Sequence, residues 1–387
     1  MNITRIGIDI SKRVWVSHAI AVSQAREHTV WANKKDTPEG CIERLRRLVP
    51  CAVALEACGG AHLAARRIQA LGHTVMLIPA QHVKPYRRGG KNDGNDARAI
   101  VEAMASSGMP TVGVKSEAQL DVQAMLCERE RQKKNRVALA NQIRGLLMER
   151  GIVLAKSLSQ LRAFLCLYVA VDPALDGMAG ITSVGRQKRS VELGAGSAAF
   201  RALIGELHQE LLALDKLLAR RDRAVAQLAK HDPRCVRLMS VPGIGPMSAV
   251  SLSCAFACVK RFKKARSFAA ALGLAQRQNS TGGKQQLGRI TKAGNSRLRA
   301  LLVHGARSRL NAAARAKKAG RVAQDSTAAW ALSLTERMHV NKAVVALANK
   351  NARIAWAILR NPEARYEPQH QPPRARPNPV GEDGGAH

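Results

Sequence analysis

The pattern of apolar and polar residues alternates between strand-type and helix-type segments over the first hundred residues of the chain. Residues 5–11, 14–22 and 27–32 have the apolar, β-branched character of strands, and they follow one another closely enough to be antiparallel neighbours. Thr37-Pro38-Glu39 then has the cap, the proline and the acidic first turn that mark a helix start. The first part of the chain therefore opens with three strands and a helix.

The same alternation continues as far as residue 105. It predicts a strand over residues 52–56, a helix over 61–71, a strand over 74–79 and a helix over 91–105. An order of three strands followed by alternating helices and strands is typical of an α/β domain, with a mixed sheet and helices on both faces. We assign this domain to residues 1–115.

The hydrophobic period changes to that of long helices over residues 116–232. A seam of apolar residues in steps of three and four indicates a coiled-coil arm of about three heptads, made of Leu207, Leu211, Leu214, Leu218, Val225 and Leu228. The seam could pack on its own domain or join a second copy of the chain. The charges that flank it favour self-association.

The remainder of the chain is mainly helical and extremely basic. Residues 236–360 hold 23 Lys and Arg against two acidic residues, and the 387-residue chain carries a net charge of +34. So large a positive charge favours nucleic acid as the partner, since no basic amphipathic stretch suggests a membrane surface. We assign residues 233–360 to a basic all-α domain, and the Pro- and Gly-rich residues 361–387 to a disordered tail.

Composition excludes several other classes of protein. An apolar content of 46% is too high for a disordered basic chain, and an aromatic content of 3% argues against stacking as the main way of holding single strands. The eight cysteines are scattered without the spacing of a zinc site. With neither a signal peptide nor a membrane-spanning run in sight, we expect a cytoplasmic, reduced setting.

Four acidic residues stand where strands and helices of the first domain end or begin. Asp9 and Glu56 close apolar strands, and Asp93 and Asp96 lie one helical turn apart. Each could instead cap a helix or pair with an arginine. Together, these hard oxygen ligands favour a site for Mg²⁺ or Mn²⁺, which could serve phosphoryl transfer.

A glycine-rich loop in the basic domain offers a hydroxyl group beside phosphate-binding cations. Ser280 and Thr281 precede two glycines, and either hydroxyl could be a nucleophile. The cations around them, which would contact phosphate, are Arg277, Lys284, Arg289 and Lys292. A flexible basic loop is the alternative.

The turn at residues 240–249 resembles that of helix-hairpin-helix modules. Gly243 and Gly245 would present backbone N–H groups to a DNA phosphate at a helix start. The alternative is an ordinary tight turn, but the basic surroundings favour contact with DNA.

These motifs, in this order, resemble the DEDD transposases of the insertion-sequence-110 family, which includes the Piv-type DNA invertase. The resemblance rests on Gly7-Ile8-Asp9, Leu55-Glu56-Ala57, residues 93–97, the turn at 241–246 and the loop at 279–284, whose form is similar to the insertion-sequence-1111 branch. It implies a RuvC-like (RNase H-like) domain, a coiled-coil arm and a helical transposase domain. By the same resemblance, Asp9, Glu56, Asp93 and Asp96 form a metal-binding tetrad and Ser280 is the essential serine.

The resulting expectation is a site-specific DNA recombinase that mobilises its own insertion sequence. The resemblance implies DNA ends and target as partners, a structured guide (bridge) RNA, and dimers that form a tetramer on DNA, in the bacterial cytoplasm at the nucleoid. Two alternatives stay open. One is a metal-dependent junction nuclease or invertase in which water attacks, and the other is a non-enzymatic nucleic-acid-binding protein.

Overall fold

The computed structural model describes residues 3–23, 26–90, 92–170, 179–184, 187–192, 196–256, 259–321 and 326–368. The chain divides into two compact units. Unit 1 comprises Met1–Asp121 with the short segment Phe256–Cys258, and unit 2 comprises Val122–Ala255 with Val259–His387.

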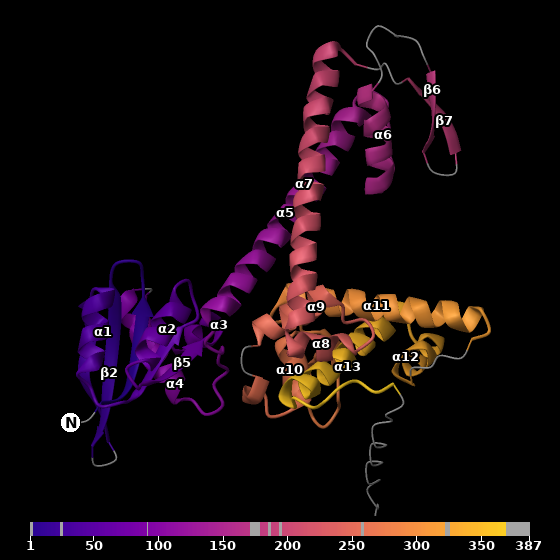
Figure 1. The fold of residues 1–387 in the computed structure, drawn as a ribbon. Helices are drawn as coiled ribbons and strands as arrows, with labels where there is room; N and C mark the ends of the chain where they lie inside the picture. The colour runs from indigo at the N-terminus through magenta and orange to yellow at the C-terminus, as the bar shows by residue number, and fades with distance from the viewer. Residues whose placement is uncertain are drawn as a thin grey trace, which may run out of the picture. The chain divides into compact units, whose positions relative to one another are not determined.

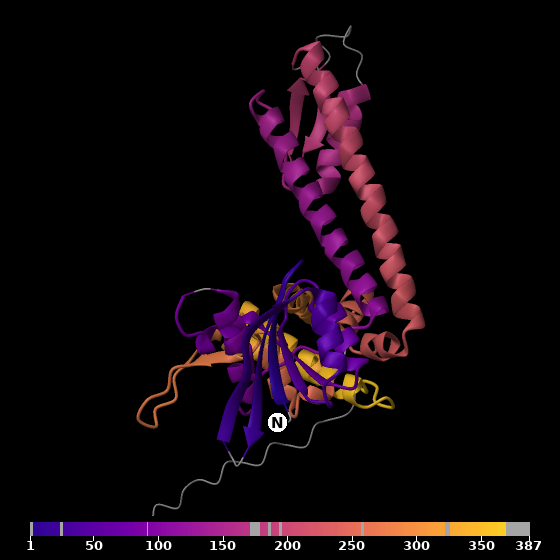
Figure 2. The ribbon, with the colours of Figure 1, turned by 90° about the vertical axis from the view of Figure 1, so that its left-hand side faces the viewer.

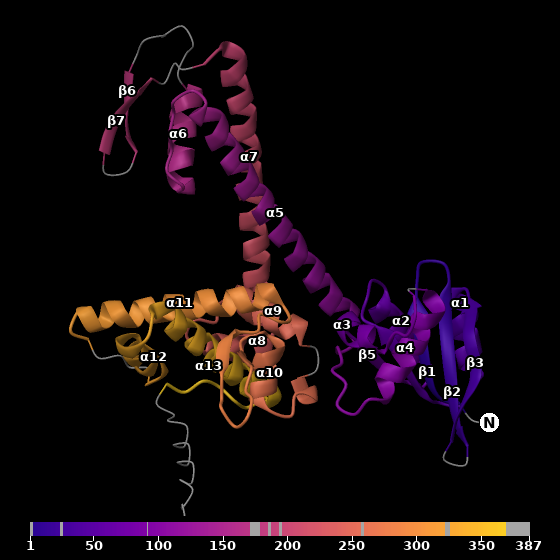
Figure 3. The same cartoon turned by 180° about the vertical axis from the view of Figure 1, so that it is seen from behind.

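Unit 1 is built on a five-stranded mixed sheet of order β3-β2-β1-β4-β5 (Figures 1 and 3). The strands are β1 (Ile3–Ile10), β2 (Trp15–Ser23), β3 (Arg26–Asp36), β4 (Ala52–Glu56) and β5 (Thr74–Ile78). The first three are antiparallel neighbours, as predicted, whereas β1, β4 and β5 run parallel. Parallel strands bring their carboxyl ends to one edge of the sheet.

Helices cover both faces of this sheet, as the strand and helix order predicted. They are α1 (Pro38–Arg46), α2 (Ala61–Gln69), α3 (Ala80–Val83), the 3₁₀ turn η1 (Lys84–Tyr86) and α4 (Asp93–Ala105). The short helix α3 and the turn η1 were not predicted. The mixed α/β architecture is compatible with the RuvC-like fold that the resemblance implied.

Side-chain alternation along β1 and β4 divides the core into two layers. Ile6, Ile8 and Leu55 lie in the cluster that packs against α1 and α2. Ala54 lies in the second cluster, with Ile100 of α4. Because successive strand residues face opposite sides, Gly7 and Asp9 face the same layer as α4.

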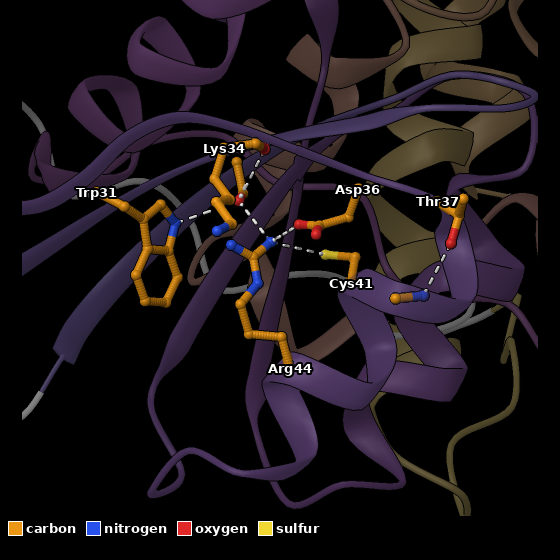
Figure 4. A network of polar contacts seen from close by, with 8 residues as sticks. Trp31, Lys34, Asp36, Thr37, Cys41 and Arg44 are labelled. Atoms are coloured by element: carbon orange, nitrogen blue, oxygen red, sulfur yellow. Dashed lines mark hydrogen bonds and ion pairs between the residues drawn. The ribbon is translucent and has the colours of Figure 1, made fainter.

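A polar network fastens α1 to the antiparallel edge of the sheet (Figure 4). The Arg44 guanidinium on α1 pairs with Asp36 and donates to the Ser17 hydroxyl, 3.0 Å away. It also stacks over the Trp31 ring at 4.8 Å, and the Trp31 indole donates to Ser17 at 3.2 Å. One arginine thus ties together two strands and a helix.

Unit 2 includes two long helices that lie side by side (Figures 1 and 2). They are α5 (Glu117–Met148) and α7 (Ala198–His231), joined by α6 (Leu158–Ala170) and the hairpin β6 (Ala179–Val184) and β7 (Gln187–Glu192). The helical pattern over residues 116–232 did not predict this hairpin. The β-branched residues Ile181, Thr182 and Val184 favour strand over helix in this hairpin.

The predicted leucine seam is packed within its own chain. Leu211 is fully buried in a cluster with Ile143 of α5 and Leu165 of α6, and Leu218 is 4% exposed. This outcome favours the simpler of the two readings of the seam, an arm packed on its own domain. Homo-oligomerisation stays a prediction, without the seam as its basis.

Ion pairs align the helices of the arm. The carboxylate of Asp215 on α7 accepts hydrogen bonds from Arg136 of α5 at 3.1 Å and from Arg162 of α6 at 2.7 Å. Towards the other end of α7, Asp222 pairs with Arg129 and Arg221 pairs with Glu128. These ion pairs join α7 to both α5 and α6.

The basic body of unit 2 is helical. Its elements are α8 (Pro233–Met239), α9 (Pro246–Ala255), η2 (Val259–Arg261), α10 (Ala265–Ala271), the hairpin β8 (Gln276–Gln278) and β9 (Leu287–Ile290), α11 (Ser296–Lys318), α12 (Ser326–Arg337) and α13 (Val340–Arg360). No helix among the described residues is long and apolar enough to cross a membrane.

The segment after α13 falls in the predicted disordered tail, yet residues 361–368 are held by hydrogen bonds. The Tyr366 amide donates to Ser240, and its hydroxyl accepts from Arg309 at 2.8 Å. Tyr366 thus anchors part of a segment that its composition predicted to be disordered. Residues 369–387 lie outside the described residues.

The role of Asp215 can be tested against that of Asp222. Asp215→Asn leaves two half-buried guanidinium groups without their counter-charge, and should lower the free energy of unfolding by about 1–3 kcal/mol. Asp222→Asn removes a single pair whose carboxylate is 50% exposed, and should cost no more than about 0.5 kcal/mol. Urea unfolding of both variants measures the difference, and equal losses would contradict a central role for Asp215.

Candidate active site

Asp9 and Glu56 are brought together by strand register. Strands β1 and β4 pair in parallel, with Ile8 opposite Leu55. The next residue of each strand is the acidic one, so both carboxylates stand at the same carboxyl edge of the sheet. This is the edge at which open α/β sheets place their ligands.

Gly7 allows helix α4 to approach the strand that carries Asp9. A Cβ atom at Gly7 would lie 2.5 Å from the Ala97 carbonyl oxygen and 2.7 Å from the Val101 amide nitrogen, both backbone atoms of α4. No side chain fits in that space. Because Asp9 faces the same side two residues later, the helix that carries Asp93 and Asp96 lies against it.

The start of α4 is fixed by asparagines. The Asn92 side chain caps the helix by accepting from the Asn95 amide at 2.8 Å, and the Asn95 side chain donates to the Gly90 carbonyl. Asp93 and Asp96 occupy the first turn, where the helix dipole favours negative charge. Asp93 is exposed, whereas the Asp96 side chain is 18% exposed.

The four carboxylates act on one another through their charges. Burial, followed by repulsion from Asp96, Asp93 and Glu56, raises the pKa of Asp9 to about 6. Partial burial together with Glu56 and Asp9 also raises the pKa of the Cys58 thiol. Because the Asp9 carboxyl and the Cys58 thiol both resist ionisation beside the other acidic side chains, this region has a negative potential, which attracts cations.

The donor chemistry fits a hard divalent cation, but the side chains do not enclose one. No group of three or more His, Cys, Asp or Glu among the described residues is arranged to hold a metal ion. The Asp96 carboxylate forms an ion pair with the Arg87 guanidinium, 3.2 Å away. The structure therefore places the tetrad in one neighbourhood without a closed coordination shell.

The second predicted group lies on an exposed hairpin of unit 2, drawn in orange in Figure 2. Strands β8 and β9 pair, and the turn from Thr281 to Lys284 is closed by a 3.0 Å backbone hydrogen bond. Gly282 and Gly283 have φ of 54° and 73°. Two central residues of positive φ match the twist of a hairpin turn, and only glycine adopts this pair without strain.

The hydroxyl oxygen of Ser280 accepts two hydrogen bonds within this hairpin. One comes from the Gln278 side-chain amide at 3.0 Å and the other from the Gln286 backbone amide at 3.2 Å. Both donors would stabilise negative charge on that oxygen. The Thr281 hydroxyl has no such pair of donors among the described residues, so the two adjacent hydroxyl groups differ in their hydrogen bonding.

The base of the hairpin is anchored by close backbone contacts. A Cβ atom at Gly273 would lie 2.2 Å from the Ala293 carbonyl oxygen, and one at Gly294 would lie 2.0 Å from that of Ala271. Arg299 adds hydrogen bonds to the Leu272 and Ala293 carbonyls. The Ser280 loop is thus exposed at its tip and fixed at its base.

The four cations predicted to contact phosphate surround this hairpin. Each is exposed, and none forms an ion pair with another residue in the part of the chain that the structure describes. They are Arg277, Lys284, Arg289 and Lys292. Unpaired, exposed cations are free to contact phosphate.

The turn with Gly243 and Gly245 joins α8 to α9. Gly243 has a φ of 92°, and a Cβ there would lie 2.7 Å from the Gly305 carbonyl oxygen of α11. Close packing within the protein thus accounts for this glycine. A Cβ at Gly245 would meet open space, so the start of α9 is the part of the turn that a phosphate can approach.

Three residues of these sites were not predicted from the sequence. Arg87 pairs with Asp96, Cys58 shares the potential of Asp9, and Gln278 donates to Ser280. Cys58 follows Glu56 by two residues and Gln278 precedes Ser280 by two, so proximity in sequence was an available signal. No sequence signal pointed to Arg87, because arginine is common throughout this chain.

Comparison with known proteins relates both units to transposases. A family model described as "Transposase", of the DEDD type of IS110 elements, matches residues 6–150, and the model "Transposase IS116/IS110/IS902 family" matches residues 235–320. The chain is 39% identical over 369 residues to a probable family 20 transposase of Pseudomonas aeruginosa, covering 95% of this chain and 100% of the relative.

Two further relatives are named as transposases of particular elements. The transposase for insertion sequence element IS1111A of Coxiella burnetii is 38% identical over 311 residues, covering 80% of this chain and 78% of the relative. The transposase for insertion sequence element IS1328 of Yersinia enterocolitica is 32% identical over 357 residues, covering 92% and 97%.

The close approach at Gly7 is testable by adding one methyl group. Gly7→Ala must displace the backbone of α4 and should lower the free energy of unfolding by about 1–3 kcal/mol. Gly59→Ala is the matched control, because a Cβ there meets nothing within 4 Å. Thermal melting compares the two, and equal melting temperatures would refute the tight contact.

The raised pKa of Asp9 predicts a pH-dependent stability. Its proton is bound more tightly in the folded chain, so ionisation lowers the free energy of unfolding as pH rises from about 4 through about 6. With metal removed by EDTA, Asp9→Asn should be more stable than wild type by about 1–3 kcal/mol at about pH 7.5, and this gain should shrink towards pH 4.

The exposed Asp121 provides the control for that experiment. Asp121→Asn should follow the wild-type stability at each pH, because this side chain is exposed to solvent. Denaturant unfolding as a function of pH measures all three chains. Asp9→Asn that is less stable than wild type near neutral pH would contradict the repulsion.

Proposed function

Because the chain belongs to the IS110 family of transposases and is a DNA transposase, we propose that it mobilises an insertion sequence by cleaving DNA strands, with Ser280 as the nucleophile and its acidic tetrad in support. Membership of the family implies binding to DNA. The steps proposed below concern how this chain would carry out the reaction.

The observation that carries the proposal is the environment of the Ser280 hydroxyl. A serine is a weak nucleophile until its oxygen is made easier to deprotonate. Gln278 and Gln286 direct two N–H donors at that oxygen, at 3.0 and 3.2 Å. Exposed cations beside the hairpin, including Arg277 and Arg289, would stabilise charge on the attacked phosphate.

In the proposed cleavage step, the Ser280 oxygen forms a bond to phosphorus and the bond from phosphorus to a sugar oxygen breaks. The serine proton ends on the leaving sugar oxygen as a hydroxyl group. The strand is then held as a phosphoserine ester. Attack on that ester by a sugar hydroxyl of another strand regenerates the serine, so no bond energy is lost during exchange.

Asp9, Glu56, Asp93 and Asp96 are the residues that would hold a divalent cation. A bound Mg²⁺ or Mn²⁺ would supply Lewis-acid stabilisation of charge on phosphate oxygens. The negative potential that raises the pKa of Asp9 supports this assignment. For all four carboxylates to contribute, Asp96 would exchange its ion pair with Arg87 for the cation.

We further propose a structured guide RNA and a homo-oligomer on DNA as partners. A net charge of +34 exceeds what one short duplex contact neutralises, which supports a second polyanion. Exchange between two element ends and a target also requires more than one cleavage site. Dimers that form a tetramer on DNA would meet that requirement.

A metal-dependent nuclease in which water attacks is the second candidate. The observation that favours it is the pKa of about 6 at Asp9, since such a carboxylate can accept a proton from water near neutral pH. In that reaction Ser280 would contact DNA without forming a bond to it. The two candidates differ in whether a covalent adduct accumulates.

The deciding experiment incubates the protein and its RNA with labelled element-end DNA and Mg²⁺, followed by denaturing electrophoresis. Wild type should form a covalent adduct. Ser280→Ala should bind DNA normally yet lose adduct and cleavage by roughly a thousandfold or more, and the matched control Thr281→Val should retain both. Asp9→Ala should lose cleavage while keeping DNA binding.

Other outcomes overturn parts of the proposal. Adduct that persists in Ser280→Ala and vanishes in Thr281→Val would move the nucleophile to Thr281. Cleaved ends without any adduct in wild type would favour attack by water. Equal activity after removal of the RNA would refute the guide.

A further inference from the structure

A cavity of about 300 Å³ lies in unit 2, apart from the tetrad and the Ser280 hairpin. Its walls come from the last turn of α7, from α8 and from the segment that follows α13. The charged side chains on these walls are Lys230, Arg237, Arg365 and Glu363. Three permanent cations face one carboxylate, so the cavity is positive.

The charged side chains of the cavity have no ion-pair partners among the described residues. Lys230, Arg237, Arg365 and Glu363 form no ion pair with any residue that the structure describes. The neighbouring acid, Asp232, pairs with Arg234 at 2.9 Å and is thereby compensated. An anion that entered the cavity would therefore meet cations that have no other partner.

Arg237 gives a second indication of a missing partner. Its Nε atom is buried and has no hydrogen-bond partner among the described residues. A buried polar atom without a partner is costly, more so in a charged group. An acceptor oxygen of a ligand that reached this atom would remove that cost.

Apolar surface completes the cavity. Pro233, Val236 and Pro362 line it beside the charged groups, and Val236 is 42% exposed. An inorganic anion needs no such surface, but the sugar and base of a nucleotide do. A volume of about 300 Å³ lies at the lower end of small-ligand sites, which suits one nucleotide.

The wall that carries Arg365 is held in place before any ligand binds. Tyr366, the next residue, donates from its amide to Ser240 at 2.9 Å, and its hydroxyl accepts from Arg309. The Glu363 amide donates to the Asn361 side chain at 3.0 Å. Fixed walls lower the entropic cost of binding.

We propose that this cavity binds one nucleotide of a single nucleic-acid strand. Lys230, Arg237 and Arg365 contact its phosphate, and its sugar or base lies over Val236. Glu363 accepts a hydrogen bond from an N–H or O–H of the base or sugar. Arg237 lies one helical turn before the turn that contains Gly245, so a strand held here could continue to the start of α9, where a phosphate can approach.

The test compares short single strands of thymidine or uridine, roughly five nucleotides long, with a duplex. The full-length protein is titrated with each labelled probe. Val236→Trp fills the cavity without changing its charge, and should weaken single-strand binding about tenfold while leaving duplex binding unchanged. Val340→Trp, at a site 45% exposed and outside the cavity, is the control and should bind as wild type.

Charge is tested separately. Arg365→Gln should weaken single-strand binding about tenfold and reduce the slope of log affinity against log salt by roughly 0.7. Arg223→Gln, an exposed arginine on α7 outside the cavity, should change neither. Loss confined to thymidine assigns the site to DNA, and loss confined to uridine assigns it to RNA.

Two results would overturn the site. The first is wild-type binding by Val236→Trp. The second is equal weakening of single strands and duplex by Arg365→Gln, which would reduce the cavity to general surface charge. If Val236→Trp fails to fold, as circular dichroism would show, Pro362→Trp fills the cavity from the opposite wall and decides. Neither result bears on Ser280 or the tetrad.

Discussion

The contact between β1 and α4 at Gly7 is the constraint on which unit 1 depends. Backbone atoms of α4 lie where a side chain at Gly7 would stand, so helix and strand approach more closely than any other residue permits. That approach sets the depth at which α4 lies on the sheet. It thereby decides how near the first turn of α4 comes to the carboxyl ends of β1 and β4, where Asp9 and Glu56 stand.

Unit 2 uses the same device at two further places. Gly243 meets Gly305 of α11, and Gly273 meets the backbone at Ala293, in both cases closer than a Cβ would allow. The first contact fixes the turn before α9 and the second fixes the base of the Ser280 hairpin. In each unit, candidate functional side chains thus lie near places where glycine brings two backbone segments together.

Much of unit 1 could be predicted from the sequence, because short strands and capped helices leave a local signal. Short apolar segments placed β1 to β5, and the cap at Thr37 placed α1. Contacts between distant segments left no such signal. The leucine seam of α7 has a clear period, but nothing in that period says that its partner is α5 of the same chain. Arg87 could not be chosen as the partner of Asp96 among so many arginines.

For the acidic cluster, the four carboxylates could be predicted from the sequence, but their arrangement in space could not. Carboxylates at the ends of apolar strands are costly, and the pKa of about 6 at Asp9 shows that this cost persists in the folded chain. The first turn of α4 offsets part of it through the helix dipole, and Arg87 offsets part of it at Asp96. Neither removes the repulsion at Asp9. An amide in place of one carboxylate would relieve this repulsion. The chain instead keeps all four carboxylates, and with them the negative potential that a cation requires at that edge of the sheet.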